Sequence, residues 1–192
     1  VPEDLRLMEA ILKGEAMEVQ VKHPVVADDV VGTPLRTSSA YCRTLLALLA
    51  AQKPMSLKNG HPVVVDNSGL ARANSRHFHH IFPAAYLRRQ DEPRDSIQSV
   101  ANIMLVPQHE NLSHGSKAPA TYLPPLASKA GDKWRTWLQS HLVSAKAEKA
   151  LLQGDYGAFT RARGTLIAAR ANVAMALSKE QVEALLREVQ PG

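Results

Sequence analysis

Cysteine is almost absent from this sequence, which also lacks the apolar segments typical of membrane proteins and of secretory signal peptides. The single cysteine, Cys42, rules out an internal disulfide and a cysteine-based zinc knuckle. No apolar run approaches the roughly 18 residues that a membrane span requires. The first residues include two acids and no basic side chain, so the pattern of a secretory signal peptide is missing. These absences predict a soluble chain, and a reducing cytoplasm is the expected compartment.

Further absences concern the organisation of the chain. It has no internal repeat, no low-complexity tract and no glycine-rich phosphate loop, so nucleotide dependence cannot be assigned to it. It does not begin with methionine, which suggests a fragment of a longer protein. At 192 residues it is long enough to bury a hydrophobic core. We expect one compact domain with a helical scaffold over 1–58, a functional core over 59–125 and a helical region over 126–192.

The net charge is positive and unevenly distributed. It amounts to +5, and residues 126–192 hold ten basic against six acidic side chains, whereas residues 1–58 hold seven of each. Release of counterions at lysine and arginine contacts drives polyanion binding, so this imbalance is compatible with a nucleic-acid backbone as partner. Many ordinary basic proteins show the same imbalance.

Helical periodicity dominates both ends of the chain. The spacing of Tyr41, Leu45, Leu48 and Leu49 predicts an amphipathic helix over 38–52 with a serine at its start. Apolar residues at helical spacing predict further helices over 3–13, 134–142, 159–177 and 182–189. The predicted core face of the 159–177 helix consists of Phe159, Ala162, Leu166, Val173 and Leu177.

The centre of the chain has a different character. Six of the eight histidines fall between His61 and His114. This stretch carries two predicted strands, around 77–82 and 100–106, separated by a polar, basic loop. With a helix start near Asn111, the predicted order is strand, loop, strand, helix.

Four polar side chains in this region suggest a catalytic or metal-binding site. Adjacent residues on a strand face opposite sides, so one of His79 and His80 can bind a metal while the other meets water and substrate. Asn102 lies within the second apolar strand, where a buried amide costs free energy unless it is paired, so we expect it to clamp a backbone. Asn111, beyond Pro107, offers a side-chain oxygen as a hard metal ligand.

This arrangement resembles the HNH, or ββα-metal, nuclease superfamily. The family pattern is a metal-binding Asp or His, a histidine general base, a proline three residues later, an asparagine within the hairpin and a terminal Asn or His ligand. The matching residues are His79, His80, Pro83, Asn102 and Asn111.

A narrower resemblance covers most of the chain. Residues 79–83, 99–103 and 111–122 are similar to the C-terminal nuclease domains of GmrSD-type anti-phage restriction effectors and of phosphorothioate-sensing defence proteins. The helices around 38–52 and 156–170 look similar too. The resemblance implies a mainly α fold with a small β-hairpin, in which helices wrap a ββα-metal core.

The resemblance also implies a metal-dependent endonuclease that nicks DNA. His80 would deprotonate the attacking water, and Asn102 would fix the loop that aims it. His79 and Asn111 would hold one divalent cation, Mg²⁺ or Mn²⁺, against the scissile phosphate. Many family members carry aspartate where this chain has His79, which leaves the identity of the metal open.

The expected partners follow from the same resemblance, whereas the accessory residues are suggested by their spacing and charge. The expected partners are double-stranded DNA and an N-terminal sensor or NTPase domain of a full-length bacterial restriction protein. His77 and His114 are additional candidates for a ligand or a phosphate contact. Candidate DNA contacts are Arg76, Arg88, Arg89 and Lys117, although arginines in polar loops usually belong to a solvated surface.

Several alternatives compete with the interpretation as a DNA nuclease. His61, His109 and His141 are interpreted as structural or solvated histidines. The whole domain could also be a non-catalytic DNA-binding or helical interaction module with a degenerate HNH core. An RNA nuclease is a third alternative, because nothing in the sequence reads or excludes a 2′-hydroxyl.

Overall fold

The computed structural model describes residues 13, 23–63, 78–106, 115–175 and 180. Its elements are α2 (Ala27–Val31), α3 (Ala40–Ala51), β1 (Phe78–His80), α4 (Ala84–Arg88), α5 (Arg94–Ile97), the 3₁₀ turn η2 (Val100–Asn102), β2 (Ile103–Leu105), α6 (Pro119–Ala130), the 3₁₀ turn η3 (Gly131–Lys133), α7 (Trp134–Ser140), α8 (Ala145–Gln153) and α9 (Tyr156–Ala174). Strands β1 and β2 pair in antiparallel fashion. The expected mainly helical fold with a small hairpin is therefore confirmed. The helix predicted over 182–189 lies outside the described residues, as does nearly all of the one over 3–13.

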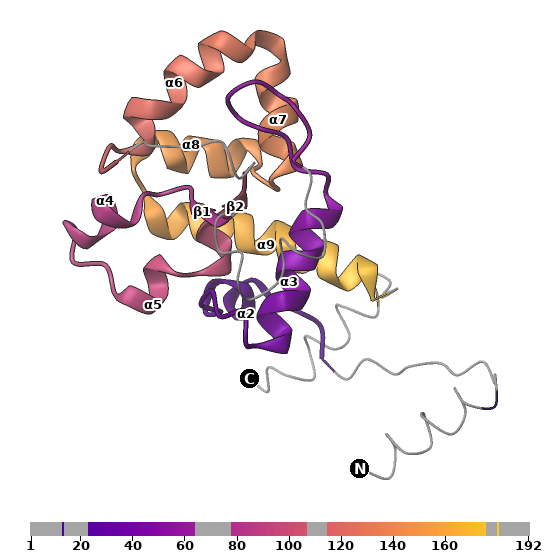
Figure 1. Ribbon diagram of the computed structural model, residues 1–192. Coiled ribbons are helices and arrows are strands. Elements are labelled where there is room, and N and C mark those ends of the chain that lie inside the picture. Colours follow the sequence, from indigo (N-terminus) through magenta and orange to yellow (C-terminus); the bar gives the residue numbers. More distant parts are fainter. Residues whose placement is uncertain (1–12, 14–22, 64–77, 107–114, 176–179, 181–192) are drawn as a thin grey trace.

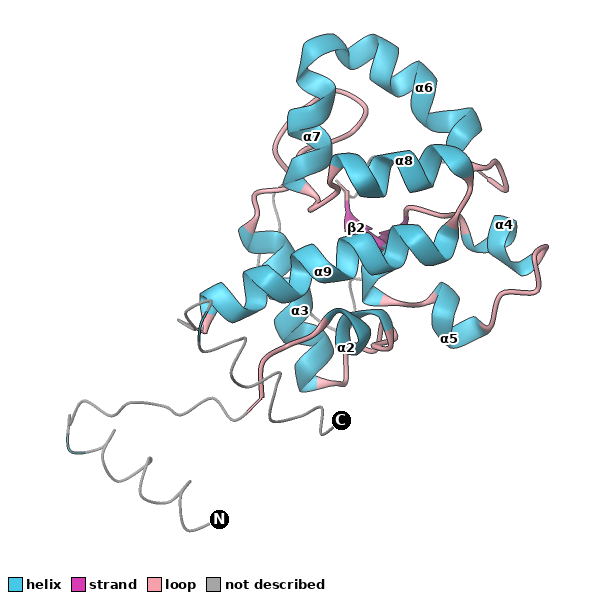
Figure 2. Cartoon of the chain, turned by 180° about the vertical axis from the view of Figure 1, so that it is seen from behind, coloured by secondary structure: helices cyan, strands magenta, loops and turns pink. Residues whose placement is uncertain are grey.

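Helix α9 lies at the centre of the described helices. It runs between α8 on one side and α2 with α3 on the other (Figures 1 and 2), and it also contacts η2. Gly164 allows α2 to come close, because a Cβ at this position would lie 3.1 Å from the carbonyl oxygen of Ala27. No described helix combines the length and the apolar character that crossing a lipid bilayer would require.

The buried apolar side chains form two clusters. The α6–α8 cluster includes Phe82, Met104, Leu123, Trp137 and Leu151. The α2–α3 cluster includes Val30, Leu45, Ile103, Leu105 and Ile167. Strand β2 lies between them, since its alternating side chains enter both clusters and all three are almost fully buried. Each of the three predicted regions of the chain contributes to this core, while boundaries at 58 and 125 stay a prediction.

Helix α3 forms where the sequence predicts it, but its buried face is shifted. The Ser39 hydroxyl accepts a hydrogen bond from the backbone N–H of Cys42 at 3.3 Å and caps the helix. The buried residues are Cys42, Leu45, Leu46 and Leu49, whereas Tyr41 is 40% exposed. The prediction that Tyr41 faces the core was wrong, because the helix meets the α2–α3 cluster along the side centred on Leu45 and Leu46.

The far end of α9 also departs from its predicted core face. Val173 is 67% exposed. The buried residues at this end of α9 are Ala168 and Asn172, and Val173, about 100° further around the helix than Asn172, lies outside that face. Leu177 lies outside the described residues.

Two predictions about the hairpin need correction. Asn102 ends the turn η2 rather than lying within a strand, because the Ser99 hydroxyl accepts the N–H of Ala101 at 3.2 Å and coils the chain before it extends. The segment predicted as a loop between the strands contains α4 and α5, which directly follow Pro83 and Pro93. Helices of five and four residues are too short to show apolar periodicity in a sequence.

Candidate functional site

The hairpin separates the two adjacent histidines. In its register, His79 pairs with Met104 and His80 pairs with Ile103. Residues directly opposite each other in an antiparallel pair share a face, so His79 lies on the face of the α6–α8 cluster and His80 on that of the α2–α3 cluster. Both side chains are half-buried at the edge of the core. The two imidazoles therefore lie on opposite faces of the hairpin, as strand alternation predicts.

Asn102 is a fully buried clamp on the backbone that follows His80. Its Oδ1 accepts the N–H of Phe82 at 2.8 Å, and its Nδ2 donates to the carbonyls of Phe82 at 3.2 Å and Ile97 at 3.1 Å. The side chain is 0% exposed. Unpaired amide groups at this depth would cost free energy, so these three bonds hold the end of β1 against the chain before η2.

The peptide groups after His80 make further hydrogen bonds that do not involve the Asn102 side chain. The N–H of Ile81 donates to the backbone carbonyl of Asn102 at 2.9 Å. The hydroxyl of Tyr122, in α6, donates to the carbonyl of Ile81 at 2.5 Å. Burial raises the pKa of Tyr122, which keeps the hydroxyl protonated and able to donate. The two residues that follow His80 are thus fixed by η2 and α6 together.

The environment of His80 favours the neutral imidazole. Burial is the largest cause of a lowered pKa for His80, and His79 and Arg88 act in the same direction, while a hydrogen bond donated by the ring to the Gln98 side chain opposes them. The Nε2 atom is shielded from solvent and has no hydrogen-bond partner within the described chain. Buried polar atoms are nearly always paired, so this nitrogen is an exception among the described side chains.

Gln98 and Arg88 are neighbours of His80 that sequence reasoning did not connect with it. Arg88 is the last residue of α4 and Gln98 directly follows α5, so the fold of the segment between the strands places both where they influence the pKa of His80. The one available signal was the position of Gln98 directly before Ser99 and the turn that holds Asn102.

The candidate DNA-contacting cations differ in their surroundings. Arg88 and Lys117 are exposed. Arg89 donates from Nη1 to the Ser116 hydroxyl at 3.0 Å and from Nη2 to the Ser116 carbonyl. Arg89 therefore ties α4 to the start of the segment that leads into α6, and fewer of its donors remain for a phosphate.

Several predicted site residues lie outside the described residues. They are Arg76, His77, Asn111 and His114. Among the residues that are described, no group of three or more His, Cys, Asp or Glu side chains could hold a metal ion. Of the two predicted metal ligands only His79 is described, and its imidazole is a donor that suits a divalent transition metal.

The histidines interpreted as structural or solvated behave accordingly where they are described. His61 is exposed. His141 is buried, its Nε2 lies 2.7 Å from the carbonyl oxygen of Met55, and burial lowers the pKa of His141 to about 4. This ring holds the 54–63 segment against α7 and stays neutral at physiological pH. His109 is outside the described residues.

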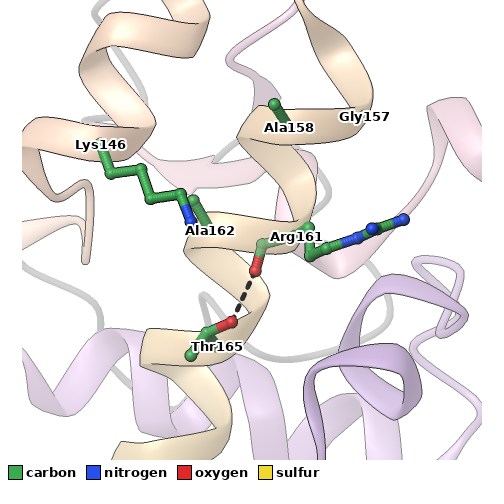
Figure 3. A pocket seen from close by; sticks show the side chains of 6 residues that line it. All are labelled: Lys146, Gly157, Ala158, Arg161, Ala162 and Thr165. Carbon is green, nitrogen blue, oxygen red and sulfur yellow. Dashed lines mark hydrogen bonds between the residues drawn. The ribbon is translucent and has the colours of Figure 1, made fainter.

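A separate cleft of about 510 Å³ opens between α8 and α9. Lys146 reaches from α8 towards α9, whereas Arg161 points away from it (Figure 3). Arg161 and Thr165 each lie two positions from Arg163, about 200° around the helix, and Arg163 faces η2. The cleft thus opens on the side of α9 that faces away from the hairpin.

Comparison with protein-family models, with curated proteins and with solved structures gave no match.

Proposed function

We propose that this chain is a metal-dependent endonuclease domain that nicks DNA, with His80 as general base. The observation that carries the proposal is the combination at the end of β1. Asn102 immobilises the backbone next to His80, while the Nε2 atom of His80 is buried and unpartnered within the described chain. A positioned, neutral imidazole can accept a proton from water near neutral pH.

The proposed reaction is an in-line displacement at phosphorus. His80 Nε2 accepts a proton from water as the water oxygen forms a bond to phosphorus and the bond to the 3′ oxygen breaks. His79 and Asn111 would hold the cation, Mg²⁺ or Mn²⁺, which supplies positive charge next to the scissile phosphate when it is bound. Asn102 keeps the imidazole on the attack side through its bonds to Phe82.

The phosphate backbone would reach the hairpin past α4 and the start of α6. Arg88 and Lys117 are exposed cations next to these elements. Neutralising either one should lower the salt dependence of DNA affinity by about one charge, because each phosphate contact releases about one counterion. Lys146→Ala, on the α8–α9 cleft, is the matched control and should leave the salt dependence unchanged.

The proposed setting is phage restriction. The observation in its favour is the resemblance of residues 79–83 and 99–103 to GmrSD-type nuclease domains. In that setting an N-terminal sensor or NTPase domain of the same protein would control the nuclease. The relevant assay compares cleavage of modified and unmodified phage DNA by this domain alone and by the full-length protein.

The deciding experiment is relaxation of supercoiled plasmid with Mg²⁺, Mn²⁺ or chelator. The wild type should yield open-circular DNA first and only with metal. His80→Ala should lower the rate by about 10²- to 10⁴-fold, since that is the range for a general base. His79→Ala and Asn111→Ala should raise the metal concentration needed for half-maximal rate. His61→Ala, at an exposed histidine, is the control and should nick normally.

Other outcomes point to the alternatives. DNA affinity without metal-dependent cleavage would favour the binding module. Faster cleavage of single-stranded RNA than of plasmid DNA would favour the RNA nuclease. Linear DNA as the earliest product at low enzyme concentration would contradict nicking by a single site.

A further inference from the structure

The largest fully buried side chain in the described part of the molecule is that of an arginine, Arg163 in α9. It is 1% exposed, and within the described residues no carboxylate lies at ion-pair distance from it. Burial lowers the pKa of Arg163 to about 9, so the guanidinium remains charged at neutral pH. Burying a charge without a counter-ion is costly, and it persists only where hydrogen bonds compensate for the lost water.

The compensating bonds of Arg163 are made to backbone carbonyls. Its Nε donates to the carbonyl of His141 at 2.9 Å. Its Nη1 donates to the carbonyl of Ala101 at 2.8 Å and, less closely, to that of Val100 at 3.5 Å. Two of these carbonyls belong to η2, the turn that ends in Asn102. The buried guanidinium therefore makes most of its hydrogen bonds to one short turn.

Arg163 adds a donor to a turn that also makes hydrogen bonds of its own, among them that from the Asn102 N–H to the Ser99 carbonyl at 2.8 Å. Within η2, the Val100 carbonyl accepts the N–H of Ile103, and the N–H of Val100 reaches the carbonyl of Thr33 at 2.8 Å. The Ala101 carbonyl lies in the core, where water cannot replace a missing donor, and Arg163 supplies that donor. This carbonyl belongs to the peptide group that joins Ala101 to Asn102.

A continuous path of short contacts leads from α9 to the hairpin. The peptide plane between Ala101 and Asn102 is held at its carbonyl by Arg163 and at its N–H by the Ser99 carbonyl. From that plane the Asn102 side chain reaches the N–H and carbonyl of Phe82, two residues after His80. A rotation of the plane would move the amide of Asn102 away from both groups and release the end of β1.

We propose that Arg163 is a positioning residue of the nicking site, which fixes η2 so that Asn102 can orient His80. This inference rests on the proposed function, and it assigns to α9 a part in catalysis without contact to DNA. If Arg163 had only a structural role, its replacement would lower the stability of the domain without a special effect at the hairpin.

The chain offers a matched control for this distinction on the same helix. Asn172, nine residues later, is also buried and also holds a backbone, since it accepts the N–H of Val25 at 2.8 Å and donates to the carbonyl of Val25 at 2.9 Å. Val25 precedes α2, and neither of these hydrogen bonds of Asn172 reaches η2. Asn172→Ala therefore removes buried side-chain-to-backbone bonds without touching the turn.

The experiment compares Arg163→Met, Arg163→Lys and Asn172→Ala with the wild type, well below their melting temperatures. Two quantities are measured: kcat and KM for plasmid nicking, and hydrogen exchange of the Phe82 amide. We expect Arg163→Met to lower kcat roughly 10- to 100-fold with little change in KM, since small misplacements of catalytic groups have effects of this size. The Phe82 amide should exchange faster. Arg163→Lys should be intermediate, and Asn172→Ala should match the wild type in both measurements.

Each alternative outcome has a defined meaning. Wild-type kcat and Phe82 exchange in Arg163→Met would overturn the proposal, and so would equal losses in Arg163→Met and Asn172→Ala. If Arg163→Met does not fold, Arg163→Lys takes its place, and wild-type behaviour of that variant overturns the proposal. If the wild type itself does not nick DNA, the proposed function fails, while exchange at Phe82 still decides whether Arg163 controls the hairpin.

Discussion

Replacement of Asn102 tests the structural basis of the site most directly. Asn102→Ala removes the bonds to the N–H and carbonyl of Phe82 and to the carbonyl of Ile97, all in a region without solvent. The N–H of Phe82 would then be buried without a partner. Asn102→Asp keeps the shape and one acceptor, but it turns an oxygen towards the two carbonyls that Nδ2 now serves.

The expected magnitudes follow from the groups left unpaired. A buried donor or acceptor without a partner costs about 1–3 kcal/mol, so Asn102→Ala should lower the free energy of unfolding by about 2–4 kcal/mol. Asn102→Asp places a carboxylate against carbonyl oxygens and should cost roughly 3–5 kcal/mol at neutral pH. Total stabilities of about 5–15 kcal/mol mean that both variants can still fold.

The dependence on pH separates the two variants. In the folded state, burial and the facing carbonyls raise the pKa of the new carboxyl above its unfolded value of about 3.9. The folded state of Asn102→Asp then binds its proton more tightly than the unfolded state does. Its stability relative to the wild type should be best at low pH and should fall as pH rises through the raised pKa.

The assay is denaturant unfolding of the wild type, Asn102→Ala and Asn102→Asp from pH 4.5 to 7.5, with plasmid nicking measured in parallel. Asn172→Ala serves as control, because it should lower stability without reducing nicking beyond the unfolded fraction. A constant difference between Asn102→Asp and the wild type across this range would refute the reasoning. It would mean that a cation such as Arg163 compensates for the new charge.

Two further predictions concern stability alone. The unfolding free energy of the wild type should fall by about 3 kcal/mol between pH 6.5 and 4 on account of His141, since its folded pKa of about 4 lies below the unfolded value and the unfolded chain takes up the proton first. His141→Gln should have a flatter pH profile in denaturant melts, and parallel profiles would contradict this. Gly164→Ala should lower the unfolding free energy by about 1–2 kcal/mol, because a Cβ would meet Val31 at 3.0 Å and the carbonyl of Ala27 at 3.1 Å, which outweighs the gain in helix propensity. Gly157→Ala, whose Cβ would have no contact closer than 3.8 Å, is the matched control and should be neutral or slightly stabilising in thermal melts.

Proline in α6 shows where local sequence rules reach their limit. Pro124 and Pro125 lie inside a twelve-residue helix, although proline normally ends one. Both are exposed, and so are Ala120 and Thr121, the residues four positions earlier whose carbonyls lose their N–H partners. Water can serve those carbonyls, so the helix continues while Tyr122 and Leu123 remain in the core. Only the orientation of the finished helix shows that the prolines face solvent.

The sequence by itself determined the local features of this protein. The mainly helical content, the serine cap of α3 and the strand alternation that puts His79 and His80 on opposite faces depend on residues a few positions apart. Periodicity and capping act over one or two turns, so a short stretch of chain is enough to encode them.

The tertiary structure alone decided which groups meet. Asn102 finds Phe82 across 20 residues, and Arg163 finds Ala101 across 62. In the sequence, Arg163 is one more cation in a basic region, yet it lies four residues after Phe159 and four before Ile167 on the buried face of α9. Burial and partnership depend on how distant segments pack, because a polar group is stable in the core only when another segment supplies its hydrogen bonds.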